Sequence, residues 1–307
     1  MNFKICDMNI SADSTFGLEK ASSGIVTNSI DTGSSDVASK LKSLKIDNKN
    51  NVMFSYLNVN SIRYKFCDLS AIIGNNVDVF SIAETKIDGS FTDAQFMLPG
   101  FTKPYRHDVS DTSGGLLTYI NQHIPSRQLK HSSTPDDIQI IVTELKLRKH
   151  KWLLFTIYRP PSQNLKYFLD HLSLLLDFHH TYENIIIIGD FNNTPDSLEI
   201  SSFMSDYDLY SFMNAPTCFK SREGRCIDLI LTNKKHSFQM SNSFETGVSD
   251  HHHMIYTMLK QSFFHIPCKK MIYRSYKNFD TAVFKADVSL FLSQFTDSGI
   301  FSSLTLP

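Results

Sequence analysis

The stretch at residues 184–193 limits the possible folds of this chain more than any other. Four consecutive isoleucines, at positions 185–188, are β-branched and apolar on both faces of an extended chain, which is typical of a strand buried on both sides. Asp190 and Asn192 follow at once and point the same way. Polar groups there cost stability unless partners, a metal or a substrate satisfy them. The stretch therefore indicates either a catalytic strand end or an ordinary turn, since Gly-Asp and Asn-Asn are common turn formers.

Composition narrows the class of protein. The chain has 307 residues, enough for one large α/β domain plus appendages, and its apolar content of 41% supports a substantial core. The net charge of −1 means that any nucleic-acid partner must be attracted by a local positive potential, from a metal and a few Lys or Arg side chains. Five scattered cysteines without a CxxC pair fit a reducing compartment. Without an apparent signal peptide or membrane span, we expect an intracellular protein with no membrane partner.

Three segments differ in character. Residues 1–49 are rich in Ser, Asp, Asn, Thr and Lys, so we predict a disordered lead segment with at most a weak helix at 36–44. Residues 50–262 carry the core pattern of a domain. Residues 263–307 are predicted to be a linker-like tail with a short helix at 281–295 and no further domain.

Within the domain, apolar runs predict strands at 52–57, 77–83, 114–120, 138–147, 152–158, 184–188, 225–231, 238–244 and 253–259. Helical periodicity predicts helices at 64–73, 164–180 and 197–205. Acids or amides follow or open several of these strands. We expect them to converge on one pocket at one rim of a sheet. Oxygen-rich ligands without a Cys or His cluster favour a hard ion, Mg²⁺ or Mn²⁺ in its place.

Six short motifs also resemble the ordered series of the endonuclease/exonuclease/phosphatase superfamily. They are LNVN at 57–60, AETK at 83–86, YRPP at 158–161, GDFN at 189–192, IDLI at 227–230 and SDH at 249–251. The phrases NVNSIR and YRPP and the YRSY of the tail are closest to the apurinic-type endonuclease domain of non-LTR (LINE-type) retrotransposons. The resemblance covers roughly residues 52–260. It implies a four-layer α/β sandwich, with two mixed β-sheets packed face to face and helices outside.

The resemblance also implies a metal site. Glu84 would hold the divalent ion, assisted by Asn58 and Asp250. Asn60 stands where many relatives carry Asp, so this site has one formal charge fewer. We regard Asn60 and Lys86 as candidate contacts to the substrate phosphate.

The catalytic roles implied by the resemblance fall on five residues. Asp190 would position or deprotonate the attacking water, and Asn192 would orient the water or the phosphate. His251, steered by Asp228, would stabilise the scissile phosphate, and Tyr158 would donate to a phosphate oxygen. Of the histidine triplet at 251–253 we assign only the first to the site and treat the other two as structural, because neighbouring residues on a strand face opposite ways.

These implications converge on a metal-dependent DNA endonuclease of retrotransposon origin that leaves a 3′-hydroxyl. Its partner would be chromosomal DNA, and its compartment the nucleus. Two alternatives stay open. One is a phosphoesterase of the same fold that acts on a phospholipid head group, because fold does not settle substrate. The other is a decayed or domesticated remnant that binds nucleic acid without cutting it.

Overall fold

The computed structural model describes residues 33–131, 134–262 and 280–296. The chain divides into two compact units, Met1–His265 and Ile266–Pro307. The described part of the second unit is the single helix α5 (Thr281–Thr296), close to the predicted helix at 281–295, and its described side chains are exposed. Our predictions for residues 1–32 and for the YRSY phrase lie outside the described residues. No helix in the described ranges is long and apolar enough to cross a membrane.

The first unit contains two six-stranded sheets, and each mixes parallel with antiparallel pairs. One sheet has the order β11-β12-β1-β2-β4-β3 and consists of β1 (Val52–Asn58), β2 (Val79–Ala83), β3 (Tyr105–His107), β4 (Leu116–Ile120), β11 (Phe238–Phe244) and β12 (Met254–Leu259). The other has the order β5-β6-β7-β8-β10-β9 and consists of β5 (Ser126–Leu129), β6 (Gln139–Leu147), β7 (His150–Tyr158), β8 (Ile185–Asp190), β9 (Tyr210–Ser211) and β10 (Asp228–Thr232). The short strands β5 and β9 were not predicted, because neither carries an apolar run.

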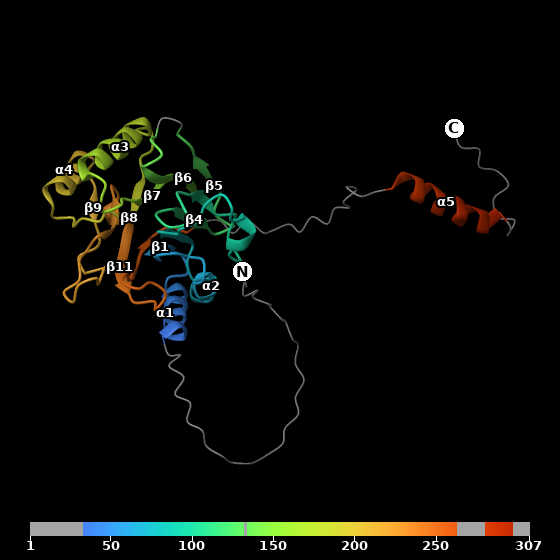
Figure 1. Cartoon of the computed structure of the whole chain (residues 1–307), viewed down its shortest axis with the longest axis horizontal. Coiled ribbons are helices and arrows are strands. Elements are labelled where there is room, and N and C mark those ends of the chain that lie inside the picture. The colour runs from blue at the N-terminus through green and yellow to red at the C-terminus, as the bar shows by residue number, and fades with distance from the viewer. Residues whose placement is uncertain (1–32, 132–133, 263–279, 297–307) are drawn as a thin grey trace, which may run out of the picture. The chain divides into compact units, whose positions relative to one another are not determined.

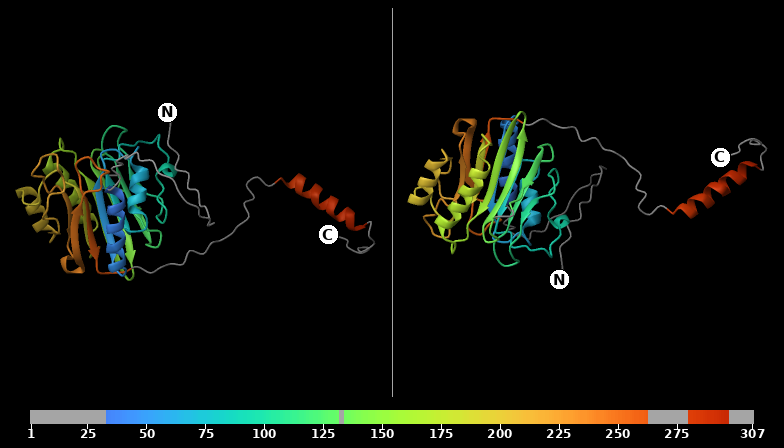
Figure 2. Two further views of the ribbon diagram at one scale, coloured as in Figure 1. Left: turned by 90° about the horizontal axis from the view of Figure 1, so that it is seen from below. Right: turned by 90° about the horizontal axis from the view of Figure 1, so that it is seen from above.

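Helices cover the outer faces of the two sheets. They are α1 (Gly33–Asp47), α2 (Phe66–Ile73), α3 (Leu165–Phe178) and α4 (Leu198–Asp206), with two short 3₁₀ turns, Asp93–Phe96 and Lys235–Ser237. Figures 1 and 2 show α3 and α4 on one side of the sandwich and α1 and α2 on the other. One apolar cluster joins the facing sheets with α3 and α4, and a second joins the first sheet with α1 and α2. The predicted four-layer α/β sandwich is therefore confirmed.

The isoleucine strand is the centre of the second sheet, as its composition requires. β8 lies between β7 and β10, and all six of its residues are buried. Gly189 pairs with Ile157 of β7. A Cβ atom at Gly189 would come within 2.1 Å of the Ile157 carbonyl oxygen, so no larger residue fits between the two strands. Asp190, the next residue, ends β8 and pairs with Tyr158 of β7.

Helix α1 corrects the extent of order that we predicted for residues 1–49, which was a disordered lead segment with at most a weak helix at 36–44. Residues 33–47 form a helix, and its Val37 and Leu41 are buried in the same apolar cluster as Leu69 and Ile73 of α2. Lys45 near its end pairs with Asp78, which is buried. Val37 and Leu41 lie four residues apart on one face, and the polar composition around them produces only the weak helical pattern that we predicted at 36–44.

Candidate active site

Polar side chains meet at one rim of the sandwich because the strand directions bring them there. β1, β2, β7 and β8 all end at this rim, whereas β10 begins at it, antiparallel to β8. Asp190 therefore lies directly opposite both Tyr158 and Asp228 in the second sheet. Asn58 ends β1 opposite Ala83, and Glu84 follows Ala83. The rim collects strand ends of both sheets, as the sequence predicts.

Asn58 connects the two sheets across this rim. Its fully buried amide nitrogen, Nδ2, donates to Glu84 Oε1 at 2.8 Å and to Asp190 Oδ2 at 3.1 Å. The Tyr158 hydroxyl donates to the same Glu84 oxygen at 3.0 Å. The other oxygen of Asp190 accepts from the backbone N–H of Asn192 at 2.7 Å. These hydrogen bonds hold two carboxylates from different sheets in fixed positions.

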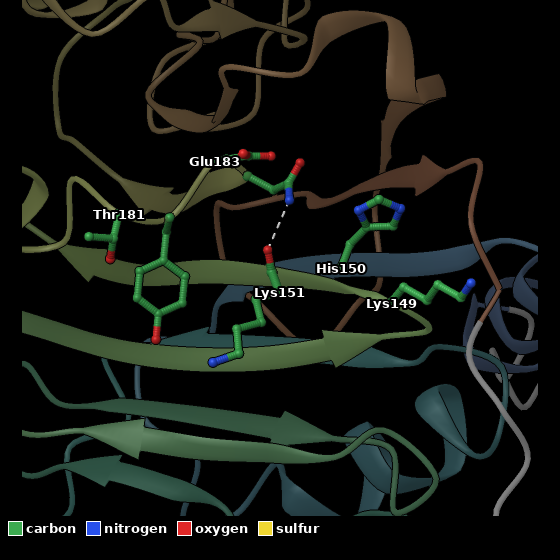
Figure 3. A pocket seen from close by; sticks show the side chains of 7 residues that line it. Lys149, His150, Lys151, Thr181 and Glu183 are labelled. Atoms are coloured by element: carbon green, nitrogen blue, oxygen red, sulfur yellow. Dashed lines mark hydrogen bonds between the residues drawn. The ribbon is translucent and has the colours of Figure 1, made fainter.

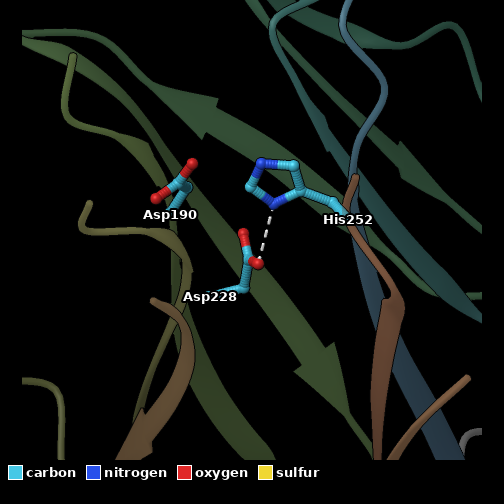
Figure 4. A group of neighbouring side chains, drawn as sticks. All are labelled: Asp190, Asp228 and His252. Carbon is cyan, nitrogen blue, oxygen red and sulfur yellow. Dashed lines mark hydrogen bonds and ion pairs between the residues drawn. The ribbon is translucent and has the colours of Figure 1, made fainter. Parts of the chain in front are cut away.

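A second group of charges lies beside this network. Asp190, Asp228 and His252 are all buried, and one ligand atom of each lies within 4.8 Å of the others. Figure 4 shows the three side chains arranged as a triangle, and the Nδ1 atom of His252 is bonded to Asp228 Oδ2 at 2.9 Å. Among the described residues this is the single group of three or more His, Cys, Asp or Glu side chains close enough to share a metal ion.

The identity of this histidine corrects a prediction, because we expected His251 to pair with Asp228. The structure instead exposes His251 and buries His252 against Asp228. His252 pairs with Cys218 in an isolated β-bridge, and its backbone N–H donates to Ser249 Oγ at 3.2 Å. Neighbouring residues on an extended segment face opposite ways. Only one of the two neighbouring histidines faces the site, as we expected, but it is His252 and not the His251 of the SDH motif.

Burial and neighbouring charge shift the pKa values of the group. Burial, followed by the adjacent Asp228 carboxylate, raises the pKa of Asp190 to about 7. Burial alone would lower the pKa of His252, but the charge and hydrogen bond of Asp228 outweigh it and raise that pKa to about 11. Near neutral pH, His252 is therefore a buried cation, and Asp190 is a carboxyl group able to take up or release a proton.

A third group of residues lies on the solvent side of Glu84. The Lys86 ammonium lies 3.6 Å from Glu84 Oε2 and also donates to the amide oxygen of Asn60. Asn60 Nδ2 in turn donates to Asp250 at 2.9 Å, and Lys65 pairs with Asp250 at 3.2 Å. Asp250 is about half exposed, with 51% of its side chain accessible, and joins the network only through these two neighbours. The predicted metal ligands Glu84 and Asp250 are therefore connected indirectly.

The backbone of the rim is strained where these side chains are presented. Seven described residues other than glycine have positive φ, and five of them lie at the rim. They are Asn60, Ser61, Glu84, Lys86 and Asn192. Asn tolerates this left-handed region, but Glu and Lys adopt it at a cost. Strain of this kind persists only where surrounding contacts impose it, and it is commonly found at functional sites.

Arg159 provides such contacts for the loop after β8. The side chain is 5% exposed and its Nε donates to the Phe191 carbonyl at 2.6 Å, while Nη2 donates to the Asn192 carbonyl at 3.1 Å. Asn192 returns a hydrogen bond from Nδ2 to the Arg159 carbonyl at 2.8 Å. The Asn192 side chain thus fixes the loop that carries Asp190, and its amide is already occupied by the protein.

Two buried oxygens at the site have no hydrogen-bond partner among the described residues. They are Asp228 Oδ1 and the hydroxyl of Tyr56, which lies on the same face of β1 as Asn58. Such orphans in a buried site indicate a bound water or ion. The carboxylates of Glu84 and Asp190 are oxygen donors of the kind that a hard divalent cation prefers, and the Asn58 amide nitrogen lies between them. The residues present therefore fit such an ion.

Sequence reasoning missed three contributors. His252 was excluded because the SDH motif pointed to its neighbour. Tyr56 could have been found from its two-residue spacing to Asn58. Arg159 was given no role, although a charged residue between a core strand and two prolines is itself a signal.

Known proteins resemble this chain in sequence profile and in fold. A sequence profile of the Endonuclease/Exonuclease/phosphatase family matches residues 56–251. No curated protein sequence is significantly similar to the chain. The endonuclease domain of TRAS1, described as a telomere-specific non-LTR retrotransposon, has a TM-score of 0.56 at 13% identity, covering 68% of this chain and 98% of that one.

Two further solved structures have the same fold. The AP endonuclease LMAP from Leishmania major has a TM-score of 0.58 at 13% identity, covering 71% of this chain and 90% of that one. The APE2 catalytic domain of Xenopus laevis has a TM-score of 0.56 at 15% identity, with coverages of 71% and 95%. At 13–15% identity these likenesses show a common fold.

Proposed function

The chain belongs to the endonuclease/exonuclease/phosphatase family, and from that premise we propose that it is a divalent-metal-dependent endonuclease that hydrolyses a phosphodiester bond of DNA and leaves a 3′-hydroxyl. The observation that carries the proposal is the buried group of Asp190, Asp228 and His252 beside Glu84. A retrotransposon origin is supported by the LNVNSIR and YRPP phrases. Such an enzyme would act in the nucleus, where chromosomal DNA lies.

Asp190 is the residue suited to handle the attacking water. Its pKa of about 7 matches the working range of a general base, which is most effective when its pKa is near the operating pH. Asn58 and the backbone N–H of Asn192 hold its two oxygens, so the carboxylate is oriented before substrate arrives. A proton taken from water would reside on Asp190.

His252 is the residue suited to face the phosphate. Its charged form is maintained by Asp228, so a fixed positive charge faces the rim without any proton transfer during the reaction. Preorganised charge of this kind stabilises the anionic transition state of phosphoryl transfer. Tyr158 has a separate role. Burial raises the pKa of its hydroxyl well above the ordinary value, so Tyr158 stays protonated and can donate a hydrogen bond.

Glu84 is the residue that would hold Mg²⁺, or Mn²⁺ in its place. Asn58 would join it as a ligand once its amide is turned to present the oxygen, because Nδ2 now donates to Glu84 and Asp190. A metal bound there would neutralise charge that develops on the phosphate oxygens. Lys86 now lies against Glu84 Oε2 and the Asn60 oxygen, so a cation is already favoured at that position. Asp250 is assigned an outer role in this site, because it reaches Glu84 only through Asn60 and Lys86.

Incubation with supercoiled plasmid tests the proposal. Open circles should form with Mg²⁺ and not with EDTA, and a DNA polymerase should extend the nicks directly, because they end in a 3′-hydroxyl. An Asp190→Ala protein purified identically excludes a contaminating nuclease. Binding without nicking under any divalent metal would favour the decayed remnant. Release of phosphate from a phospholipid head group, with DNA left intact, would favour the phospholipid alternative.

A further inference from the structure

A second polar hollow lies at the opposite ends of the strands that form the rim. A cavity of about 910 Å³ is bordered by the β6–β7 turn, by the residues before β1 and by the end of β12. A smaller cavity of about 310 Å³ adjoins it and shares Lys149, His150 and Asn184. Figure 3 shows Lys149, His150 and Lys151 along the smaller cavity, with Glu183 on its other side. We call the larger cavity the basic hollow.

The basic hollow is lined by cations and amides. Arg148, Lys149 and Lys260 line it with the imidazoles of His150 and His236, and none of its described lining residues is an acid. Lys149 and Lys260 are exposed and make no ion pair with any described residue. This concentration of uncompensated positive charge contrasts with the net charge of −1 of the chain, and it favours an anionic ligand.

The turn that supplies two of these cations is conformationally unfavourable for one of them, Arg148. Leu147 pairs with His150, so Arg148 and Lys149 form a two-residue hairpin loop. Arg148 has a φ of +53°, in the left-handed region that such loops normally fill with Asn or Gly. Arg148 also donates to the Ser262 hydroxyl at the other wall of the hollow. A strained arginine where glycine would fit better indicates that its charge has a use.

The lining favours a phosphate backbone over a nucleobase. The one tryptophan at the hollow, Trp152, is 2% exposed, and its indole N–H donates to Gln261 Oε1 at 3.1 Å. It cannot serve as a stacking surface for a base. Flexible exposed Lys and Arg with amides beside them are instead typical of contacts to phosphate oxygens, which carry no sequence information.

The basic hollow is separate from the candidate active site. β7 starts at His150 beside the hollow and ends at Tyr158 in the rim, and eight residue steps at ~3.3 Å each amount to roughly 26 Å. β8 and β1 start next to the hollow and end at Asp190 and Asn58 in the same way. The basic hollow and the candidate active site are therefore separated by the length of a strand.

We propose that the basic hollow binds the phosphodiester backbone of a nucleic-acid segment distinct from the one at the rim. The ligand is a polynucleotide, because the basic hollow, at about 910 Å³, is larger than a single phosphate requires. Binding is electrostatic and independent of base sequence. The proposal does not depend on cleavage, since the hollow would function equally in a protein without catalytic activity.

The test is a salt titration of binding by the full chain in EDTA, which prevents cleavage. A short fluorescent DNA duplex and a single-stranded RNA serve as separate probes, and anisotropy gives the binding constant. In the variant R148Q/K149Q/K260Q the slope of log K against log salt should fall by roughly 0.9 for each lost duplex contact, and by roughly 0.7 for single strands. The probe that responds identifies DNA or RNA as the source.

A matched control is the variant K42Q/K130Q/K166Q, which removes three exposed cations elsewhere. It should retain the wild-type slope. Thermal melting followed by circular dichroism verifies that both variants fold. Equal slopes for the two triple variants on both probes would overturn the proposal, as would binding of ATP at the hollow without either polynucleotide. If the wild-type protein does not nick DNA but the three proteins show the predicted salt slopes, only the proposed function is refuted.

Discussion

The two ends of the same strands have opposite chemistry. At the rim, Asp190 and Asp228 are brought together around one buried histidine, and Asn58 links Asp190 to Glu84. At the basic hollow, Arg148, Lys149 and Lys260 are arranged around a space without a described acid. The rim side chains are buried and interlocked by hydrogen bonds, whereas the two lysines of the hollow are exposed and unpaired among described residues.

The difference reflects what each end must do. Buried carboxylates repel one another, so they persist only when donors such as Asn58 hold them and a cation balances them. Exposed ammonium groups pay little desolvation and need no fixed geometry to attract phosphate. Rim substitutions should therefore act on chemistry and on local order, whereas substitutions at the hollow should act on binding and its salt dependence.

The largest expected effect follows from Asp190→Ala. Loss of a general base costs about 10²–10⁴-fold in rate, so Mg²⁺-dependent plasmid nicking should fall within that range. The triple variant of the basic hollow should keep the wild-type rate on a short duplex at saturating concentration. Full activity in a folded Asp190→Ala protein would remove Asp190 from the chemistry, and equal losses in both variants would abolish the distinction between the two ends.

Helix α1 tests whether stability and chemistry are separable. Leu41→Ala removes a fully buried side chain, so the free energy of unfolding should drop by about 3 kcal/mol. Urea unfolding measures this, and Lys42→Ala on the exposed face is the matched control, expected within ~0.5 kcal/mol of wild type. Nicking by the folded Leu41→Ala protein should be unchanged. An unaltered unfolding midpoint would return residues 33–47 to the disordered lead segment that we first predicted.

Arg159→Met sharpens the contrast between buried and exposed cations. The substitution leaves the carbonyls of Phe191 and Asn192 without their donor, so stability should fall by about 2 kcal/mol, with some compensation because a buried charge is also removed. Activity should fall too, since the loop carrying Asp190 loses its support. Lys260→Met in the basic hollow should change stability by less than ~0.5 kcal/mol. Similar unfolding curves for the two variants would contradict the role of Arg159.

The protonation of His252 gives the smallest and most local effect. Because Asp228 raises its pKa to about 11, the imidazolium should persist from pH 6 to 9 in metal-free protein, as the ring ¹⁵N shifts would report. Its stabilising contribution is complete below the unfolded pKa of about 6.5 and is lost as pH rises through about 11. In Asp228→Asn, burial dominates, so the ring should be neutral at pH 7. If the His252 ring stays charged in that variant, Asp228 is not the cause of its raised pKa.

Much of this fold can be predicted from sequence because its strands are apolar runs. The isoleucine strand and its neighbour at 152–158 are apolar runs typical of buried strands, and helix α3 repeats apolar residues at the helical period. The convergence of Asn58, Glu84 and Asp190 follows equally, since strand direction determines which ends meet. Strands β5 and β9 were not predicted because they are short and partly exposed. Helix α1 was predicted too short, at 36–44, because its polar composition gives little periodicity.

The site is less predictable where one residue of register decides the chemistry. His251 and His252 are identical in type, and only the turn at Ser249 determines which of them faces Asp228. The neighbouring loop depends on backbone conformations at Glu84 and Lys86 that these residues rarely adopt. Long-range packing imposes such conformations, so a local pattern does not reveal them.

A side-by-side assay of His251→Ala and His252→Ala tests most directly whether this rim is an active site with the geometry described. Both proteins would be compared with wild type in Mg²⁺-dependent plasmid nicking, after melting curves establish that each is folded. His252→Ala should lose at least about 10²-fold in rate, because the fixed charge facing the phosphate disappears, while His251→Ala should stay near the wild-type rate. A severe loss in His251→Ala with His252→Ala active would contradict the account.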